Sequence, residues 1–467
     1  MRTLHSIKRD GGRISAALAT LYCLAGAAPA LAQDIPPETE EAPLETETTP
    51  PQTDEMPLEA VNASPEPEES GSGTEIFSEH TLSLLFDGRF VAADGRESWL
   101  EGGLGKTRFD GSSDGDLQFR PVPVEAILMW QPRLTDSLGA SVSAGWQRGQ
   151  ENAIDLFEAF VTFQPGRTAR TRFLLRAGLF WPNISLEHAG AAWSVTDTIT
   201  PSAINSWVGE EVKVLGLEGT LTTAFGEHEV SATGAAFGFN DTAGTLLSFR
   251  GWALHDIKAG AFGHHPVPPL NDFIVHLQSR ITRPFIELDD RVGFYGQIVW
   301  RPPLPFAFDI LYYDNRGDPK AFNTDLQWGW RTKFLNVGAN ADLGPSTRLL
   351  AQAMTGTTLM GFQTGGVEWV DTRFRSVYVL VRHEIGRGAV TGRIDWFDTR
   401  ERGSQMAREE SEDGWALTAA GRYTVTDNAV LFLEAMHVRS DRGTRRGLGL
   451  PPVEHQTVLQ AALRITL

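Results

Sequence analysis

Cationic side chains recur at alternate positions in several apolar stretches of the sequence. In one stretch, Arg172 and Arg176 alternate with Phe173, Leu175 and Ala177. A guanidinium group stays charged at physiological pH, and its planar donors match the oxygen atoms of phosphates and carboxylates. Seven candidates occupy such positions: Arg172, Arg176, Arg331, Lys333, Arg393, Arg422 and Arg464. If these stretches are strands of one barrel, the seven side chains line its interior and attract anions.

Carboxylates gather in one long segment, residues 182–211, which reads PNISLEHAGAAWSVTDTITPSAINSWVGEE. Its acidic residues are Glu187, Asp197, Glu210 and Glu211. Apolar residues such as Trp193 and Trp207 give this segment anchors for packing, so we expect it to fold into the lumen as a constriction loop. Acidic and basic walls that face each other in a narrow channel would filter ions by charge.

A plainer interpretation exists for each single arginine, as a solvated side chain or as one half of an ion pair with a neighbour such as Asp395. Arg also outnumbers Lys by 32 to 5 in residues 79–467. That excess fits the binding of phosphate or carboxylate, but a GC-rich genome produces the same bias.

Other chemistry has little support in the sequence. The one cysteine, Cys23, lies in an N-terminal apolar stretch, and His264 and His265 have no carboxylate at a spacing typical of metal ligands. No local motif indicates the Ser/His pair of a barrel phospholipase, although distant strands could supply one. Glycine-rich phosphate loops and nucleic-acid motifs are absent from the sequence. We therefore expect no catalytic residues, no metal, no cofactor and no nucleic-acid partner.

The N-terminal 78 residues differ from the rest of the chain. Residues 1–32 have a basic start, an apolar core and the small-residue ending Ala30-Leu31-Ala32, which is typical of a cleaved signal peptide. Residues 33–78 hold 13 acidic residues, many prolines and no Lys or Arg, so they predict a disordered periplasmic tether. The full chain has a net charge of −18, but residues 79–467 carry only −8 of it.

Residues 79–467 alternate apolar and polar side chains in segments of about ten residues, which predicts strands that are exposed on one face. The last segment is the clearest, with Leu459, Leu463 and Ile465 on one face and Gln460 and Arg464 on the other. Aromatic residues recur near the segment ends, and short turns alternate with long polar connections. This pattern predicts an all-β, transmembrane antiparallel β-barrel with long extracellular loops; a secreted sandwich or propeller is the alternative.

The segments give a count of sixteen strands. Residues 245–290 are either a long extracellular loop or add a pair near 245–254 and 271–282, which would raise the count to eighteen. Residues 81–91 also look like a strand but would break the up-and-down parity, so their place stays open. Long connections are expected at 182–210, 356–371, 399–414 and 440–455. The sixteen predicted strands lie near 97–107, 117–130, 137–147, 153–163, 171–181, 210–225, 228–239, 292–300, 305–313, 324–336, 346–356, 373–385, 388–399, 414–424, 428–439 and 455–467.

Three segments resemble the phosphate-selective porin O/P group of bacterial outer-membrane porins. They are RAGLFWPNISLEHAGAAW at 176–193, INSWVGEE at 204–211 and WGWRTKFLNVGAN at 328–340. The resemblance extends over most of residues 79–467. It implies a trimeric barrel of sixteen strands that passes small anions such as phosphate along an arginine-lined channel. The chain departs from the group in its few lysines, in its last residue, Leu467, where porins typically end in Phe, and in its acidic tether.

These observations lead us to expect a passive channel for small hydrophilic solutes in the outer membrane, with anion or phosphate preference as a second expectation. The expected partners are outer-membrane lipid, small anionic or polar solutes, the barrel-assembly machinery and further copies of the chain in a homotrimer. Two alternatives stay open. One is a barrel that anchors the acidic tether for a periplasmic partner, and the other is a barrel enzyme such as a phospholipase.

Overall fold

The computed structural model describes residues 74–112, 114–166, 170–406 and 410–467. The contacts within the chain divide it into residues 1–55 and 56–467, and all of the described residues belong to the second unit. The predicted signal peptide, 1–32, lies outside the described residues, as does the predicted tether, 33–78, up to residue 73.

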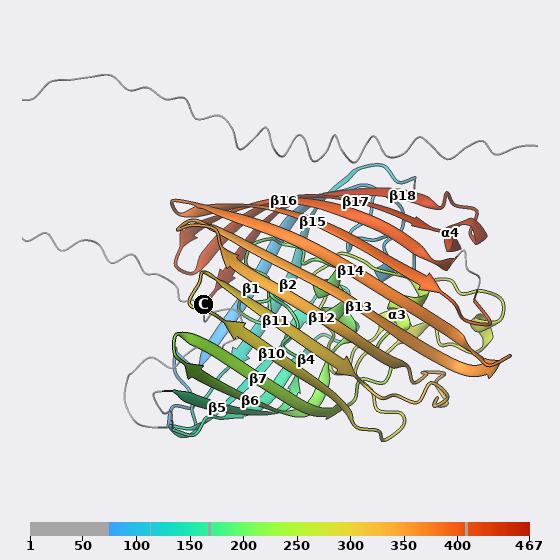
Figure 1. The fold of residues 1–467 in the computed structure, drawn as a ribbon. Coiled ribbons are helices and arrows are strands. Elements are labelled where there is room, and N and C mark those ends of the chain that lie inside the picture. The colour runs from blue at the N-terminus through green and yellow to red at the C-terminus, as the bar shows by residue number, and fades with distance from the viewer. Residues whose placement is uncertain (1–73, 113, 167–169, 407–409) are drawn as a thin grey trace, which may run out of the picture. The chain divides into compact units, whose positions relative to one another are not determined.

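Within the described residues, sixteen strands pair in one closed antiparallel barrel, which confirms the predicted fold class and strand number (Figure 1). Each strand pairs with its neighbours in the sequence, β7 pairs with β10, and β1 pairs with β18 to close the barrel. The strands are β1 (Leu82–Ala93), β2 (Gln118–Trp130), β3 (Leu138–Gln147), β4 (Asp155–Phe163), β5 (Thr171–Phe180), β6 (Val214–Phe225), β7 (His228–Gly238), β10 (Gly293–Arg301), β11 (Phe306–Asp314), β12 (Arg331–Asp342), β13 (Thr347–Thr364), β14 (Val367–Ile385), β15 (Gly388–Glu401), β16 (Glu412–Thr426), β17 (Ala429–Arg442) and β18 (Val453–Thr466).

The first strand of the barrel corrects one prediction. β1 occupies the segment whose place the sequence left open, and the predicted strand near 97–107 is a loop that contains the short helix η2 (Trp99–Glu101). Gly102 ends η2 at φ 86°, a backbone conformation that glycine adopts readily. Replacing the predicted strand at 97–107 by β1 keeps both the count of sixteen and the up-and-down alternation, because the chain runs from β1 through this loop into β2.

The region after β7 is the long loop that the sequence allowed as one alternative, and the segments near 245–254 and 271–282 are not barrel strands. It holds the helices α3 (Thr245–Phe249) and η3 (Ile274–His276) and the short strands β8 (His265–Pro266) and β9 (Ile281–Thr282). One further prediction is wrong. The predicted loop at 356–371 is instead a hairpin, since β13 and β14 continue to a tight turn at Gly365 and Gly366, both at positive φ.

The two ends of the barrel differ in their connections. We call one the short-turn end, where for example only residues 386–387 and 427–428 join neighbouring strands, and the other the long-loop end, which carries residues 94–117, 181–213 and 239–292. The helix α4 (Thr444–Gly447) lies in another connection at the long-loop end. Among the residues that the structure describes, no helix has the length and hydropathy needed to cross a membrane.

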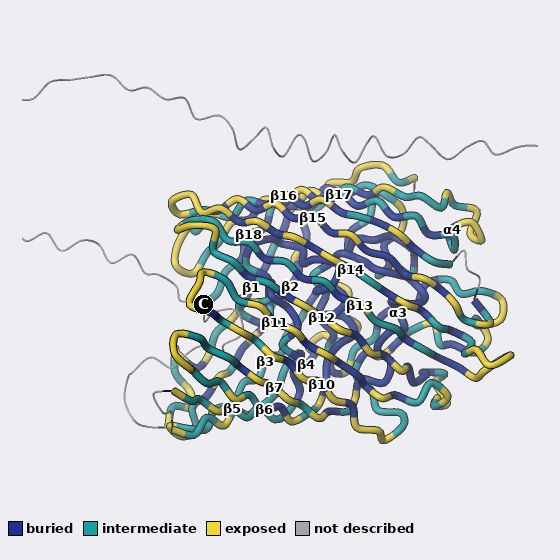
Figure 2. Tube along the Cα trace, in the orientation of Figure 1, coloured by how far each residue is buried: buried dark blue, intermediate teal, exposed yellow. Residues whose placement is uncertain are grey.

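The strands separate apolar and polar residues between their two faces, and Figure 2 shows exposed and buried residues alternating along them. On β18, Leu459 and Leu463 are exposed on the outer face, whereas Gln460 and Arg464 are buried on the inner face, as the sequence predicts. On β14, Val377, Val379 and Val381 form the outer face. An apolar exterior around a more polar interior is the arrangement of barrels that span a bilayer.

Candidate functional site: the barrel lumen

Two long connections fold into the lumen. The first, residues 181–213, joins β5 to β6 and carries the helix α2 (Ala203–Glu211); the second, residues 239–292, joins β7 to β10 and carries α3. Every residue of α2 and α3 is buried. The first loop is the third connection at the long-loop end, and its contacts with the inner wall agree with its predicted position inside the barrel.

The inner wall of β15 and β17 binds the first loop through polar contacts. The Arg393 guanidinium lies 3.0 Å from the Glu187 carboxylate and donates to the Thr200 carbonyl at 2.7 Å. The backbone N–H of Ala203, at the start of α2, donates to Asp395 at 3.0 Å, and the N–H of Ile199 donates to Glu434 at 2.7 Å. Arg393 therefore holds the loop against the wall.

Aromatic packing adds to this attachment. Trp207 on α2 is fully buried, and its ring lies 5.5 Å from the Phe334 ring of β12 and 5.2 Å from the Phe374 ring of β14. Trp252 of the second loop contacts the same indole at 6.0 Å. Buried aromatic pairs stabilise a packed interior through both area and ring geometry. Trp207 therefore joins the two loops and the wall.

The other carboxylates of α2 bind the second loop. Glu210 pairs with Arg250 at 2.8 Å, and His255 lies 2.8 Å from the same carboxylate. Despite its burial, the Arg250 guanidinium first and the His255 ring second hold the pKa of Glu210 well below its usual range. Glu211 accepts from the Trp207 indole at 2.7 Å and from the Leu246 N–H at 2.9 Å, but burial and the neighbouring Glu210 raise its pKa to about 7.

The second loop binds the wall formed by β1 and β2 through charged residues that sequence reasoning missed. Asp256 lies 2.5 Å from Arg89 of β1 and 2.7 Å from Arg108, and Lys258 lies 2.7 Å from Glu125 of β2. The two arginines hold the pKa of the Asp256 carboxyl far below its usual range. The sequence pattern did not single these residues out, since it allowed residues 245–290 to be either a long loop or an extra pair of strands.

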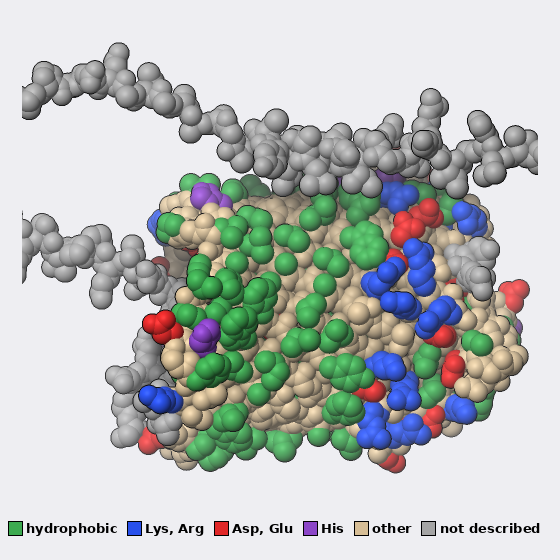
Figure 3. Space-filling model, in the orientation of Figure 1, with side chains coloured by type: hydrophobic (Ala, Val, Ile, Leu, Met, Phe, Trp, Pro, Cys, Tyr) green, Lys and Arg blue, Asp and Glu red, His purple; other side chains and the backbone are tan. Residues whose placement is uncertain are grey.

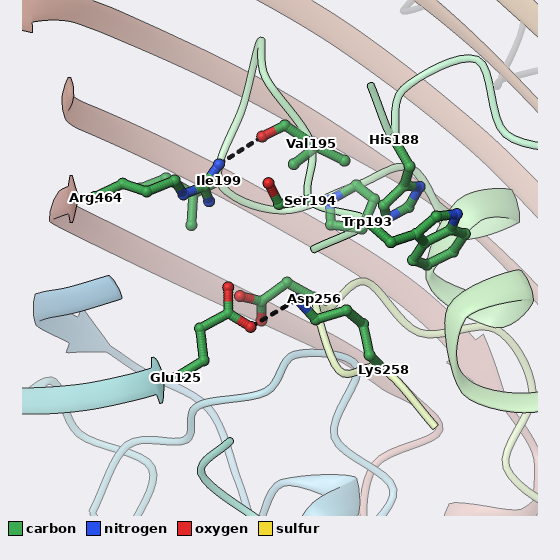
Figure 4. A pocket seen from close by; sticks show the side chains of 10 residues that line it. Glu125, His188, Trp193, Ser194, Val195, Ile199, Asp256, Lys258 and Arg464 are labelled. Atoms are coloured by element: carbon green, nitrogen blue, oxygen red, sulfur yellow. Dashed lines mark hydrogen bonds and ion pairs between the residues drawn. The ribbon is translucent and has the colours of Figure 1, made fainter. Parts of the chain in front are cut away.

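A small pocket separates the two loops from β2 and β18 (Figure 4). The pocket volume is about 10 Å³, which suffices for roughly one water molecule. Glu125, Asp256, Lys258 and Arg464 line it, and Arg464 donates to the Val195 carbonyl at 2.6 Å. At this point, acidic and basic groups face each other across a very narrow space.

A much larger cavity, about 580 Å³, lies at the short-turn end along the wall of β3 to β7 and β10. Hydroxyl groups line much of it: Thr220 bonds to Thr233 at 2.8 Å, and Thr222 bonds to Ser231 at 2.9 Å. A wall of hydroxyl groups can exchange hydrogen bonds with water and with polar solutes.

Charged residues also line this cavity. Glu229 lies between two arginines, 3.0 Å from Arg172 and 2.9 Å from Arg301. The predicted Arg172 therefore faces the cavity. Arg176, also predicted to line the lumen, is directed instead at Glu218, which lies 3.0 Å away and accepts a hydrogen bond from Tyr295.

Two of the predicted pore-lining residues point away from the lumen. On β12, Thr332 and Phe334 are buried on the inner face, whereas Arg331 and Lys333 are exposed on the outer face. The prediction was wrong because the aromatic face of this strand, which we took to meet lipid, packs against the inserted Trp207.

The inner wall of β13, β14 and β16 carries further arginines near the short-turn end. Arg348 and Arg382 lie directly opposite each other on neighbouring strands, and the predicted Arg422 donates to the Thr196 carbonyl at 3.3 Å. The predicted loop residue Asp197 lies 3.4 Å from Arg382. Burial raises the pKa of Asp197, and the three arginines oppose that rise. Arg348 and Arg382 were not among the pore-lining residues that we predicted from the sequence.

Two other groupings of polar side chains lie in the loops at the long-loop end. Ser185 bonds to His188 Nδ1 at 2.7 Å, but the same hydroxyl accepts the N–H groups of Glu187 and His188, which is typical of a turn. Oxygen atoms of Asp241, Glu287 and Asp289 lie within 4.8 Å of one another and have the donor type of a metal site. Asp241 already accepts the N–H of Leu288.

The fold and its inserted loops define a sixteen-stranded membrane-type barrel with a partly filled lumen. No known protein family matches the sequence, and no curated protein matches it. Among solved structures, the outer membrane channel DcaP of Acinetobacter baumannii is similar to this chain, with a TM-score of 0.51 at 9% identity over 85% of this chain and 100% of that one.

Two porins give weaker likenesses. The anion-selective porin of Comamonas acidovorans has a TM-score of 0.47 at 11% identity over 85% of this chain and 100% of that one. OprB of Pseudomonas putida has a TM-score of 0.46 at 11% identity over 83% of this chain and 94% of that one. At these identities, the comparison concerns the fold alone.

Proposed function

We propose that the chain is an outer-membrane porin, a passive channel for small hydrophilic solutes that prefers anions. The observation that carries this proposal is the cavity of about 580 Å³ inside the barrel, lined by hydroxyl groups and by Arg172 and Arg301. Barrels of this strand number enclose a polar interior wide enough for water-filled passages. The DcaP channel, to which the fold is similar, supports the same assignment.

The orientation in the membrane follows from the connections. Outer-membrane barrels carry short turns on the periplasmic side and longer loops outside. We therefore place the short-turn end in the periplasm. The cavity then opens toward the periplasm, and the long loops face the outside of the cell.

Residues 1–32 then act as the export signal and residues 33–78 as a periplasmic tether. Assembly as a homotrimer remains a prediction from the resemblance to porins, and chemical cross-linking of the purified protein tests it.

The anion preference rests on the inner wall near the short-turn end. Arg348, Arg382 and Arg422 face the lumen there, and two carboxylates lie beside them, Asp197 and the more exposed Glu384, which also pairs with Arg382. Three arginines beside two carboxylates leave a positive potential, which attracts anions and repels cations in a confined space. Guanidinium groups also bind phosphate oxygens in pairs, which favours phosphate among the anions.

Planar-bilayer recording of the purified mature protein tests the proposal. We expect discrete conductance steps, a reversal potential in asymmetric KCl that indicates chloride preference, and block of the chloride current by phosphate. The double variant Arg348→Gln/Arg382→Gln should reduce the anion preference, whereas Arg387→Gln, at an exposed turn position, should not. Absence of conductance steps would overturn the channel, and steps without anion preference would overturn only the selectivity.

A further inference from the structure

Cationic side chains form a row on the outside of the barrel at the long-loop end. The strand register aligns Lys333 of β12 with Thr357 of β13, Thr357 with Arg373 of β14, and Arg373 with Arg400 of β15. Neighbouring strands lie about 4.8 Å apart, so the row spans about 15 Å. Lys333, Arg373 and Arg400 are all exposed. Figure 3 shows Lys and Arg side chains gathered in this part of the outer surface.

Two acidic groups lie beside this row, and arginines are near both of them. Asp314 of β11 lies opposite Lys333 in the strand register but forms its ion pair with Arg331, at 4.0 Å. Asp398 binds Arg375 at 2.9 Å and Arg400 at 3.3 Å, and the two guanidinium groups cover it almost completely. In the part of the chain that the structure describes, Lys333 and Arg373 have no ion pair. Arg373 and Arg400 also lie directly opposite each other, and like charges in such a cross-strand pair repel. The row therefore carries an excess of positive charge that an external anion would relieve.

The row borders the apolar exterior of the barrel directly. Along the outer face of β14, Arg373 and Arg375 are followed by Val377, Val379 and Val381. Along β12, Lys333 is followed on the same face by the exposed Leu335 and Val337. Cationic and apolar surfaces thus meet on the same strands, a few residues apart.

We propose that this row binds the phosphate headgroup of an anionic membrane lipid whose acyl chains lie on the apolar surface next to it. A lipid with a phosphomonoester matches both surfaces at once, because guanidinium and ammonium groups bind phosphate oxygens while the valines and leucines contact the chains. A solute inside the channel cannot reach these residues, since they face outward. The inference rests on the membrane location in the proposed function but not on conduction.

Native mass spectrometry of the purified protein in detergent tests the inference. The probes are a diphosphorylated glucosamine lipid, zwitterionic phosphatidylcholine and inorganic phosphate. We expect the phosphorylated lipid to bind more tightly than both other probes. Removing two cationic partners in Lys333→Gln/Arg373→Gln should weaken its binding about tenfold, which corresponds to about 1.4 kcal/mol. Arg387→Gln, an exposed arginine at the short-turn end, is the matched control and should bind as the unchanged protein does.

Several outcomes would overturn the inference. If the double variant binds the phosphorylated lipid as tightly as the unchanged protein does, the row is not part of the binding site. If the unchanged protein binds phosphatidylcholine as tightly as the phosphorylated lipid, the acyl chains alone are recognised. Inorganic phosphate that binds as tightly as the lipid would mean a free-ion site instead. Because neither substituted side chain is buried or ion-paired within the described residues, the barrel should fold, and circular dichroism checks that. Conductance of the same variants tests the channel separately.

Discussion

The guanidinium of Arg393, on the inner wall of β15, lies 3.0 Å from the carboxylate of Glu187 in the loop that follows β5. Both side chains are buried, and Arg393 also binds Asp395 at 2.8 Å. From the sequence, we expected these two residues on the opposed acidic and basic walls of a narrow channel. In the structure the gap is closed between them, so the charge pair attaches the loop instead of producing a field across open solvent.

Replacing Arg393 by alanine should release the loop. The change leaves Glu187 and Asp395 buried without their cation, and breaking a buried pair in this way costs roughly 3–5 kcal/mol. The barrel should persist, because its strand pairing does not depend on this side chain. We expect larger single-channel conductance and faster hydrogen exchange in residues 195–205. Arg400→Gln, on the outer face of the same strand, is the control, and unchanged exchange in the loop would contradict the assignment.

Replacing Trp207 by alanine should loosen the contact between the two loops. Its indole contacts Trp252, Phe334 and Phe374 and donates to Glu211, so truncation leaves a cavity and an acceptor without its donor. Losses of this kind cost roughly 3–5 kcal/mol. Limited proteolysis should cut residues 181–213 earlier than in the unchanged protein. Trp396→Ala, on the exposed outer face, should leave the cleavage rate unchanged.

The stability of the inserted loops should depend on pH through Glu211. Burial and Glu210 raise its pKa to about 7, above the ordinary value of 4.5. At a pH between these two values, Glu211 is protonated in the packed loop and ionised in the open loop. The packed state therefore loses stability as pH rises from about 4.5 to about 7, and its stability changes little above that pH. Hydrogen exchange of the α2 amides, corrected for its intrinsic pH dependence, measures this trend. In Glu211→Gln the trend should disappear; if it persists, another group is responsible.

Most strands could be predicted because apolar and polar side chains alternate within each strand. In β18, for example, the alternation alone assigns Leu459 and Leu463 to the outer face and Gln460 to the inner face, without knowledge of any partner strand. The choice between residues 81–91 and 97–107 could not be made in that way. We considered both segments as strands from the sequence, and only pairing with β18, more than 350 residues away in the sequence, identifies the first strand.

The contents of the lumen were harder to predict, because they depend on contacts between distant segments. Trp207 and Trp252 lie in the lumen and pack against Phe374 on the inner face of the barrel. The rule that apolar residues of a strand face lipid therefore fails there. The same inversion misplaced Arg331 and Lys333. Glu187 and Arg393 could be proposed as opposite charges, but their direct contact follows from the path of the loop, which the sequence pattern does not encode locally.

The structure separates two arginines of β5 that the sequence analysis treated alike. Arg172 faces the cavity of about 580 Å³. Arg176 lies outside that cavity and pairs with Glu218, which also accepts a hydrogen bond from Tyr295. Charge reversal of Arg172 to Glu places a second carboxylate beside Glu229, so cations should be favoured at this wall. We expect the reversal potential in asymmetric KCl to shift toward cation preference in Arg172→Glu.

Arg176→Gln should leave that potential close to the unchanged value while lowering thermal stability, because Glu218 loses its cation. Equal shifts in both variants would mean that ions pass Arg176 as well, and no shift in Arg172→Glu would place the conducting path elsewhere in the barrel.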